Sequence, residues 1–187
     1  MNNPNHTTLA AIHDAILAHV TGHWSGQENQ LDTVAEYDPF DDKPVDSPAV
    51  LLNVDAMSYE ERDGTGRTPV IMDMALHCIL SKRTPRCQVE IRAFAAELMR
   101  LVEQVGMSRW GLGEACGMPG NISAQPADFS PGKGGFESWA VTWSQTFWVG
   151  GPDDEPYQLP DKLFASVEPE LGPDNKPDYQ QLTGFTE

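Results

Sequence analysis

Val70-Ile-Met-Asp-Met-Ala-Leu-His-Cys-Ile-Leu80 is the stretch from which the architecture follows. Its even-numbered positions are all apolar, namely Val70, Met72, Met74, Leu76, Cys78 and Leu80. A period of two is typical of a β-strand, because successive side chains point to opposite faces of a sheet. A second run with this period begins at Ala49 and places on one face Val50, Leu52, Val54 and Ala56. The charged, glycine-bearing residues 59–67 join the two runs, so we predict a β-hairpin with an exposed tip.

Two helices and two further strands surround this hairpin. Apolar residues recur every three or four positions along residues 7–20, which predicts an amphipathic helix that Gly22 ends. A second apolar stripe predicts a helix over residues 88–105 that Gly106 ends. Residues 33–37 are expected to form a short strand, and residues 138–149 a long one whose apolar face only Gln145 interrupts.

Three segments lack such periodicity. Residues 21–48 are mostly an acidic loop, and residues 110–135 are rich in glycine and proline, with a strand expected only near residues 122–129. Residues 151–187 carry nine acidic residues, two lysines and a net charge of −7, a composition that disfavours independent folding. We therefore predict a domain over residues 1–150 and an extended, acidic, proline-rich tail over residues 151–187. The predicted fold class is α+β: a mostly antiparallel sheet with two amphipathic helices packed on one face, plus long loops.

Charge is the strongest compositional feature. The chain has 12 lysines and arginines against 28 acidic residues, a net charge of −16, which disfavours tight binding to nucleic acid. Positive charge gathers nevertheless between residues 82 and 109, where the net charge is +3. Because residues 38–63 are acidic, one copy has both halves of a head-to-tail contact with a second copy. Solvated charge without a partner is the alternative reading.

Eight residues are candidates for subunit or tube contacts. They comprise acidic loop residues, arginines at the hairpin tip, the basic turn before the second helix and an aromatic residue on a polar strand face: Asp41, Asp42, Arg62, Arg67, Lys82, Arg83, Arg86 and Trp148. Aromatic residues are enriched at interface cores, which favours the tryptophan as a contact. The tip arginines are expected to meet a tail tube.

No motif requires catalysis, a cofactor or a metal. The glycines of residues 111–117 have GxGxxxG spacing and follow a predicted helix, unlike a dinucleotide-binding loop. Four histidines lie near the first helix, at positions 6, 13, 19 and 23. His19 and His23 have a spacing that chelates metal on a helix, but Gly22 separates them at the expected helix end. The three cysteines fit neither a disulfide framework nor a zinc motif, so we interpret them as free thiols.

The order of elements resembles that of the tail terminator and minor tail proteins of long-tailed bacteriophages. Four segments carry the resemblance: the helix over residues 9–20, the strand Ser47-Pro-Ala-Val-Leu-Leu-Asn-Val54, the helix over residues 88–105, and Trp139-Ala-Val-Thr-Trp-Ser-Gln-Thr-Phe147. It covers residues 7–149 and leaves out the tail. Such proteins form a six-membered ring that stops tube polymerisation and presents a surface to the head-side connector.

The resemblance implies a non-enzymatic virion protein of the tail or neck, assembled in the host cytoplasm. Its implied partners are its own copies in a hexamer, the tail tube protein and a head–tail connector or neck protein. DNA only passes through the ring, so we expect acidic residues of the segment 38–63 or of the tail to face the channel. Two alternatives remain: a neck or head-completion protein of the same virion, and a small metal-dependent hydrolase that uses the histidines. No segment is long and apolar enough to predict a membrane span.

Overall fold

The computed structural model describes residues 7–26, 30–38, 45–61, 64, 66–127 and 135–151, and the short strands 164–165 and 180–181. The chain divides into two units, Met1–Asp153 and Asp154–Glu187. In the second unit, β6 (Phe164–Ala165) pairs antiparallel with β7 (Gln180–Gln181). The rest of the predicted tail lies outside the described residues. No helix in the described ranges combines the length and apolarity of a membrane-crossing segment.

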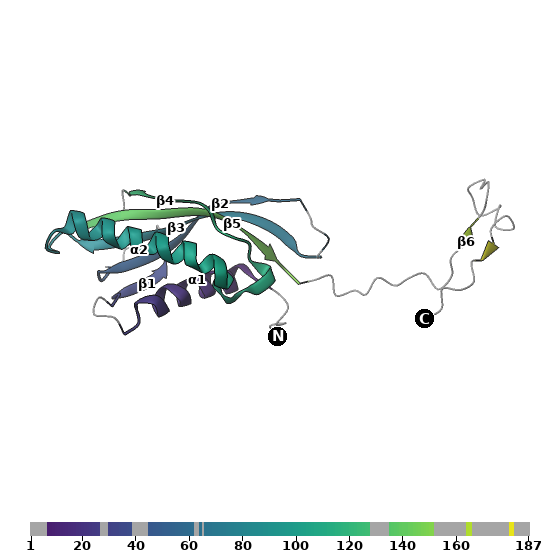
Figure 1. The fold of residues 1–187 in the computed structure, drawn as a ribbon, viewed down its shortest axis with the longest axis horizontal. Coiled ribbons are helices and arrows are strands. Elements are labelled where there is room, and N and C mark those ends of the chain that lie inside the picture. The colour runs from purple at the N-terminus through teal and green to yellow at the C-terminus, as the bar shows by residue number, and fades with distance from the viewer. Residues whose placement is uncertain are drawn as a thin grey trace. The chain divides into compact units, whose positions relative to one another are not determined.

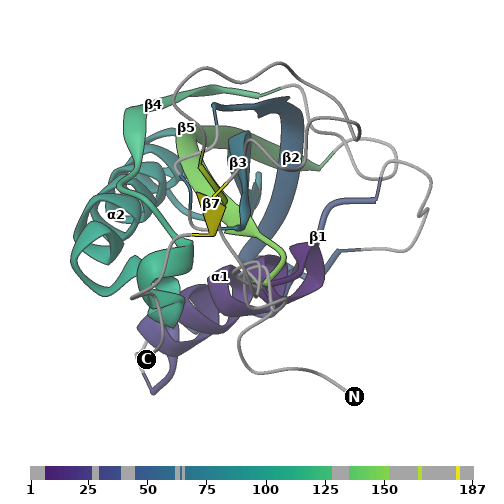
Figure 2. The same cartoon turned by 90° about the vertical axis from the view of Figure 1, so that its right-hand side faces the viewer.

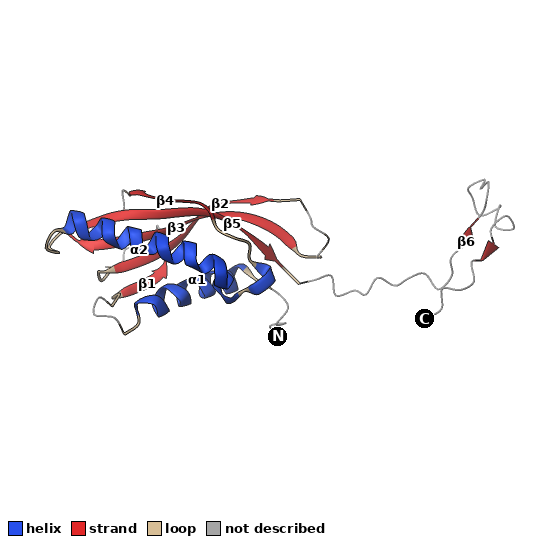
Figure 3. Cartoon of the chain, viewed as in Figure 1, coloured by secondary structure: helices blue, strands red, loops and turns tan. Residues whose placement is uncertain are grey.

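The first unit is an α+β fold built on one five-stranded sheet, as predicted (Figures 1 and 3). The strand order is β1-β2-β3-β5-β4. The strands are β1 (Thr33–Glu36), β2 (Ala49–Tyr59), β3 (Thr68–Ser81), β4 (Gly120–Pro126) and β5 (Phe136–Val149). β1 runs parallel to β2, and every other pair is antiparallel. The predicted hairpin is the β2–β3 pair.

Both helices pack on the same face of the sheet, which curves around them (Figure 2). α1 (Leu9–Trp24) and α2 (Cys87–Ser108) bury their apolar stripes against the even-numbered residues of β3. Thr8 begins α1, because its hydroxyl oxygen accepts a hydrogen bond from the amide of Ala11 at 3.1 Å. The predicted stripes and strand face therefore form one core.

Each helix is longer than predicted, because neither glycine ends it. α1 continues through Gly22 to Trp24, whose side chain is buried in the core. Burying a large side chain contributes about 1.5–3 kcal/mol, more than the ~1 kcal/mol that a helical glycine costs. α2 likewise continues through Gly106 to Ser108. His19 and His23 consequently share one helix, contrary to the expected break between them.

β2 differs from the predicted alternation in two ways. Residues 49–52 are buried on both faces, because a small second cluster of Ala49, Leu51 and Ile79 is covered by Tyr37 and Val45 on the face opposite the helices. A β-bulge at Asp55 then inserts one residue, so Met57 instead of Ala56 shares the helix-bearing face with its partner Met72.

The glycine-rich segment after α2 is more ordered than predicted. It contains two short 3-10 helices, η1 (Arg109–Gly111) and η2 (Gly113–Ala115), before β4. Trp110 is buried in the core although its φ of 53° lies in the left-handed region that disfavours an aromatic residue. Its indole N–H donates to Oε1 of Gln145 at 3.0 Å. The loop is thus anchored by a core tryptophan.

Candidate assembly surfaces

The long strands β3 and β5 separate two ends of the domain. The hairpin end contains Tyr59, Thr68 and Val149, and the turn end contains Ala49 and Ser81. Along β3, Ser81 lies eleven positions after Val70, the partner of Tyr59. At ~3.3 Å per residue this corresponds to about 35 Å. Residues at the two ends therefore cannot touch within one subunit.

The hairpin end exposes two large apolar side chains. Met57 is 58% and Tyr59 64% exposed, and both follow the bulge on the helix-bearing face. Figure 1 shows the ends of β2 and β3 extending beyond the helices, which explains why no helix covers these residues. β1 pairs only with Ala49–Leu52, so the outer edge of residues 54–59 has no strand beside it in the described part of the chain. An uncovered edge of this kind is available for contact.

Acidic residues accompany the apolar pair at the hairpin end. Glu60 and Glu61 follow β2 directly and are exposed. The hydroxyl of Thr146 donates to Oε2 of Glu60 at 3.0 Å, which anchors this carboxylate to β5. Among the predicted contact residues, Arg67 and Trp148 also lie here, because Thr68 pairs with Val149.

Trp148 is half-buried, on the face opposite the helices as predicted. A Cβ at Gly117 would lie 3.6 Å from its Cζ3 atom, so the ring lies beside this glycine. Part of its surface is therefore covered within the subunit.

The turn end carries the predicted basic residues. Lys82, Arg83 and Arg86 are exposed in the short connection between β3 and α2. Farther along α2, Arg100 is paired with Glu97, and the guanidinium of Arg92 lies 5.8 Å from the ring centre of Trp139. The basic stretch is thus not one uniform patch, and its exposed cluster is the turn.

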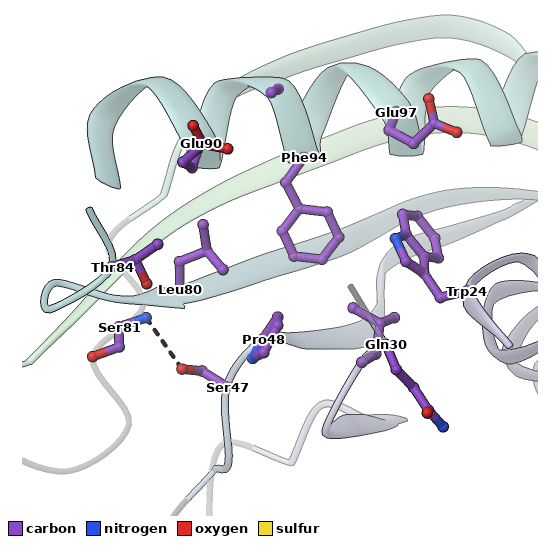
Figure 4. A pocket seen from close by; sticks show the side chains of 12 residues that line it. Trp24, Gln30, Ser47, Pro48, Leu80, Ser81, Thr84, Glu90, Phe94 and Glu97 are labelled. Carbon is purple, nitrogen blue, oxygen red and sulfur yellow. Dashed lines mark hydrogen bonds between the residues drawn. The ribbon is translucent and has the colours of Figure 1, made fainter. Parts of the chain in front are cut away.

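A pocket of about 580 Å³ opens next to this turn (Figure 4). Its walls come from the end of α1, the first half of α2, the segment before β2 and the end of β3. The apolar part consists of Trp24, Leu31, Pro48, Leu80, Ala93 and Phe94. Ser81 and Thr84 also line it, so the basic turn borders the pocket directly.

Two carboxylates of α2 stand along the pocket. Glu97 accepts hydrogen bonds from Arg100 and lies 2.7 Å from Nε2 of His23. The bond from Arg100 lowers the pKa of Glu97 to about 2, with a smaller contribution from His23. Glu90 is exposed about two turns earlier in the helix. The pocket therefore combines an aromatic floor with acceptors at its wall.

The face opposite the helices is polar beyond the small cluster. Ser144 donates to Oδ1 of Asp73 at 2.6 Å, and the hydroxyls of Ser123 and Thr142 lie 2.9 Å apart. Burial lowers the pKa of His77 on this face, although Asp55 opposes the shift. We call this surface the open face. It is lined with hydroxyls and carboxylates.

The histidines of α1 have individual partners. Nδ1 of His13 lies 2.7 Å from Glu36, and Nδ1 of His19 lies 2.9 Å from the carbonyl oxygen of Ala15. Within the described ranges, no group of three or more His, Cys, Asp or Glu side chains is placed to hold a metal ion. His6 lies outside these ranges.

The three cysteines are free thiols, as predicted. Cys78 and Cys116 are buried, and this burial raises the pKa of each thiol to about 12. Burial and Glu137 also raise the pKa of Cys87. Of the glycines of residues 111–117, Gly111 lies in η1 and Gly113 in η2, and Gly117 lies beside Thr146 and Trp148.

Asp41, Asp42 and Arg62 lie outside the described residues, so their predicted contacts stay predictions. Sequence reasoning missed the pocket, which combines segments far apart in the chain. It also missed Met57 and Tyr59, because the alternation in the sequence does not reveal the bulge that places them on the helix-bearing face. No protein-family model matches the chain, and no curated protein matches it significantly.

Proposed function

We propose that this chain is a structural subunit of a bacteriophage tail that forms a ring at the end of the tail tube. The observation that carries the proposal is the one-sided sheet. Both helices cover one face, and the strands β3 and β5 run uninterrupted from the hairpin end to the turn end. The other face and both ends are left for contacts with further copies, the tube and a head-side connector.

The distribution of charge supports the same proposal. The turn end carries an exposed basic cluster, whereas the hairpin end carries exposed acidic residues. A surface that matches a different surface of the same protein forms a heterologous contact, and such contacts close into rings when the rotation permits. The open face, with its hydroxyls and carboxylates, suits a channel through which DNA passes without being held.

The proposal is tested by adding the purified protein to polymerising tail tube protein of the same virus. A terminator stops elongation and appears as a closed ring at one tube end in electron micrographs. A neck protein, the second candidate from the same assembly, binds the connector and leaves tube length unchanged. Tubes that elongate normally, without any bound ring, would exclude the terminator function.

A further inference from the structure

The exposed apolar pair at the hairpin end and the partly apolar pocket at the turn end are flanked by charges of opposite sign. Met57 and Tyr59 are 58% and 64% exposed, so most of each side chain remains accessible. The pocket is lined by the half-buried Phe94 and by Trp24, which is only 6% exposed; the ring centroids of the two lie 5.6 Å apart. A tyrosine fits such a site well, because its ring packs on aromatic walls while its hydroxyl donates to a carboxylate. Glu90 at the pocket wall supplies that acceptor.

The charged residues that flank each surface have opposite signs. Glu60 and Glu61 follow the apolar pair, whereas Lys82, Arg83 and Arg86 border the pocket. All five residues are exposed, and Glu60 also accepts a hydrogen bond from Thr146 of its own subunit. Complementary charges of this kind accelerate encounter and fix the orientation of a contact.

We propose that the hairpin end of one copy docks into the turn-end pocket of a second copy. Met57 and Tyr59 enter the pocket, and Glu60 and Glu61 lie against the basic turn. The occupant is a second copy of this chain because one subunit has both halves and the ~35 Å between them prevents closure within itself. The contact is heterologous and continues from copy to copy. This inference rests on the proposed function and names the surfaces that build its ring.

Two variants of the full-length chain separate the halves of the contact. Met57→Ser with Tyr59→Ser removes the apolar anchor but leaves the pocket intact. Ala93→Glu places a carboxylate at an exposed pocket-lining position and leaves the hairpin end intact. Their matched controls are Met118→Ser, at a 61% exposed methionine elsewhere, and Ala96→Glu, at an exposed position of α2 that does not line the pocket. Circular dichroism verifies that all four fold.

The expected results differ for single variants and for their mixture. Light scattering should show that the wild type and both controls assemble, whereas each pocket or anchor variant alone stays near its mass of 20.6 kDa. Mixed at equal concentration, the two variants should form a pair and nothing larger, because only one intact anchor and one intact pocket can meet. Full assembly of either variant alone, or a mixture that stays monomeric at about 1 mM, overturns the docking contact.

A charge swap tests the flanking residues independently. Glu60→Lys with Glu61→Lys should weaken assembly roughly tenfold or more, with a larger effect at low salt. Adding Arg83→Glu and Arg86→Glu in the same chain should restore it, because the signs match again. Failure of the restoration would overturn the charge pairing. If every variant still forms rings like those of the wild type, this contact is refuted. The proposed function is tested separately by the tube-capping assay.

Discussion

Gln145 holds four groups of the core at once. Its Oε1 atom accepts from the indole N–H groups of Trp110 and Trp143, each at 3.0 Å. Its Nε2 atom donates to the carbonyl oxygen of Gly117 at 2.8 Å and to the thiol of Cys116 at 3.0 Å. A buried amide is costly unless it is hydrogen-bonded, and here both of its ends are satisfied. Gln145, which interrupts the apolar face of β5, thereby connects the loop after α2 to this strand through hydrogen bonds.

Replacing Gln145 with leucine should therefore destabilise the domain despite the gain in apolar character. The change leaves two buried indole donors and one carbonyl acceptor without their partner, and each such loss costs about 1–3 kcal/mol. We expect a loss of about 2–5 kcal/mol in the free energy of unfolding, measured by urea denaturation. Gln125→Leu, at an exposed position of β4, is the control and should change stability by less than about 0.5 kcal/mol. A variant as stable as the control would show that the hydrogen bonds contribute little.

At the scale of the elements, helices and strands could be predicted wherever apolar periodicity was long. The hairpin, both helices and β5 were predicted from that signal, because period and burial face are properties of the local sequence. The helix ends could not be predicted in the same way. Trp24 extends α1 because it packs against core residues that are distant in sequence. A rule that ends helices at glycine considers only neighbouring residues and cannot predict this contact. The bulge at Asp55 is equally invisible in the alternation.

Alanine substitutions at Gly22 and Gly111 should change the stability of the protein in opposite directions. Gly22 lies inside the helix, and a Cβ there would meet no atom within 4 Å. Gly22→Ala should therefore stabilise the protein by about 0.5–1 kcal/mol, because glycine loses more backbone entropy on folding. Gly111 has a φ of +74°, so Gly111→Ala should destabilise by about 1–2 kcal/mol. Thermal unfolding of both variants measures the two changes in stability. Melting temperatures that shift in the same direction would contradict this prediction.

At the scale of the whole molecule, the candidate contact residues separate into two groups that composition alone could not resolve. The sequence analysis treated Arg67, Trp148 and the basic turn as one group of contact residues. The β3–β5 register places Arg67 and Trp148 at the hairpin end and the basic turn at the opposite end. Charge patterning located the basic cluster because it is local in sequence, and its pairing with an acidic segment of a second copy stays a prediction. The pocket could not be predicted, since its wall is assembled from α1, α2, β3 and the segment before β2.

The net charge of −16 and the open face lead to a prediction about DNA. A duplex carries one negative charge per ~1.7 Å, so the net negative charge of the chain and the carboxylates of the open face repel it. Gel-shift titration at low salt should show no retention of double-stranded DNA at about 1 µM protein, whereas non-specific binders, with dissociation constants of ~10⁻⁴–10⁻⁶ M at physiological salt, bind more tightly as the salt concentration falls. Retention below that concentration would contradict the passive-channel arrangement.

The side chain of Gln145 also gives the molecule an optical signature. It clamps the indoles of Trp110 and Trp143 with their centroids 6.1 Å apart and their planes inclined by 35°. Two aromatic chromophores held so close in one asymmetric arrangement contribute to near-ultraviolet circular dichroism, a signal that disappears when specific packing is lost although secondary structure remains. The signal thus distinguishes a correctly closed core from a collapsed one. It does so without any label, because the domain's own tryptophans act as the probe.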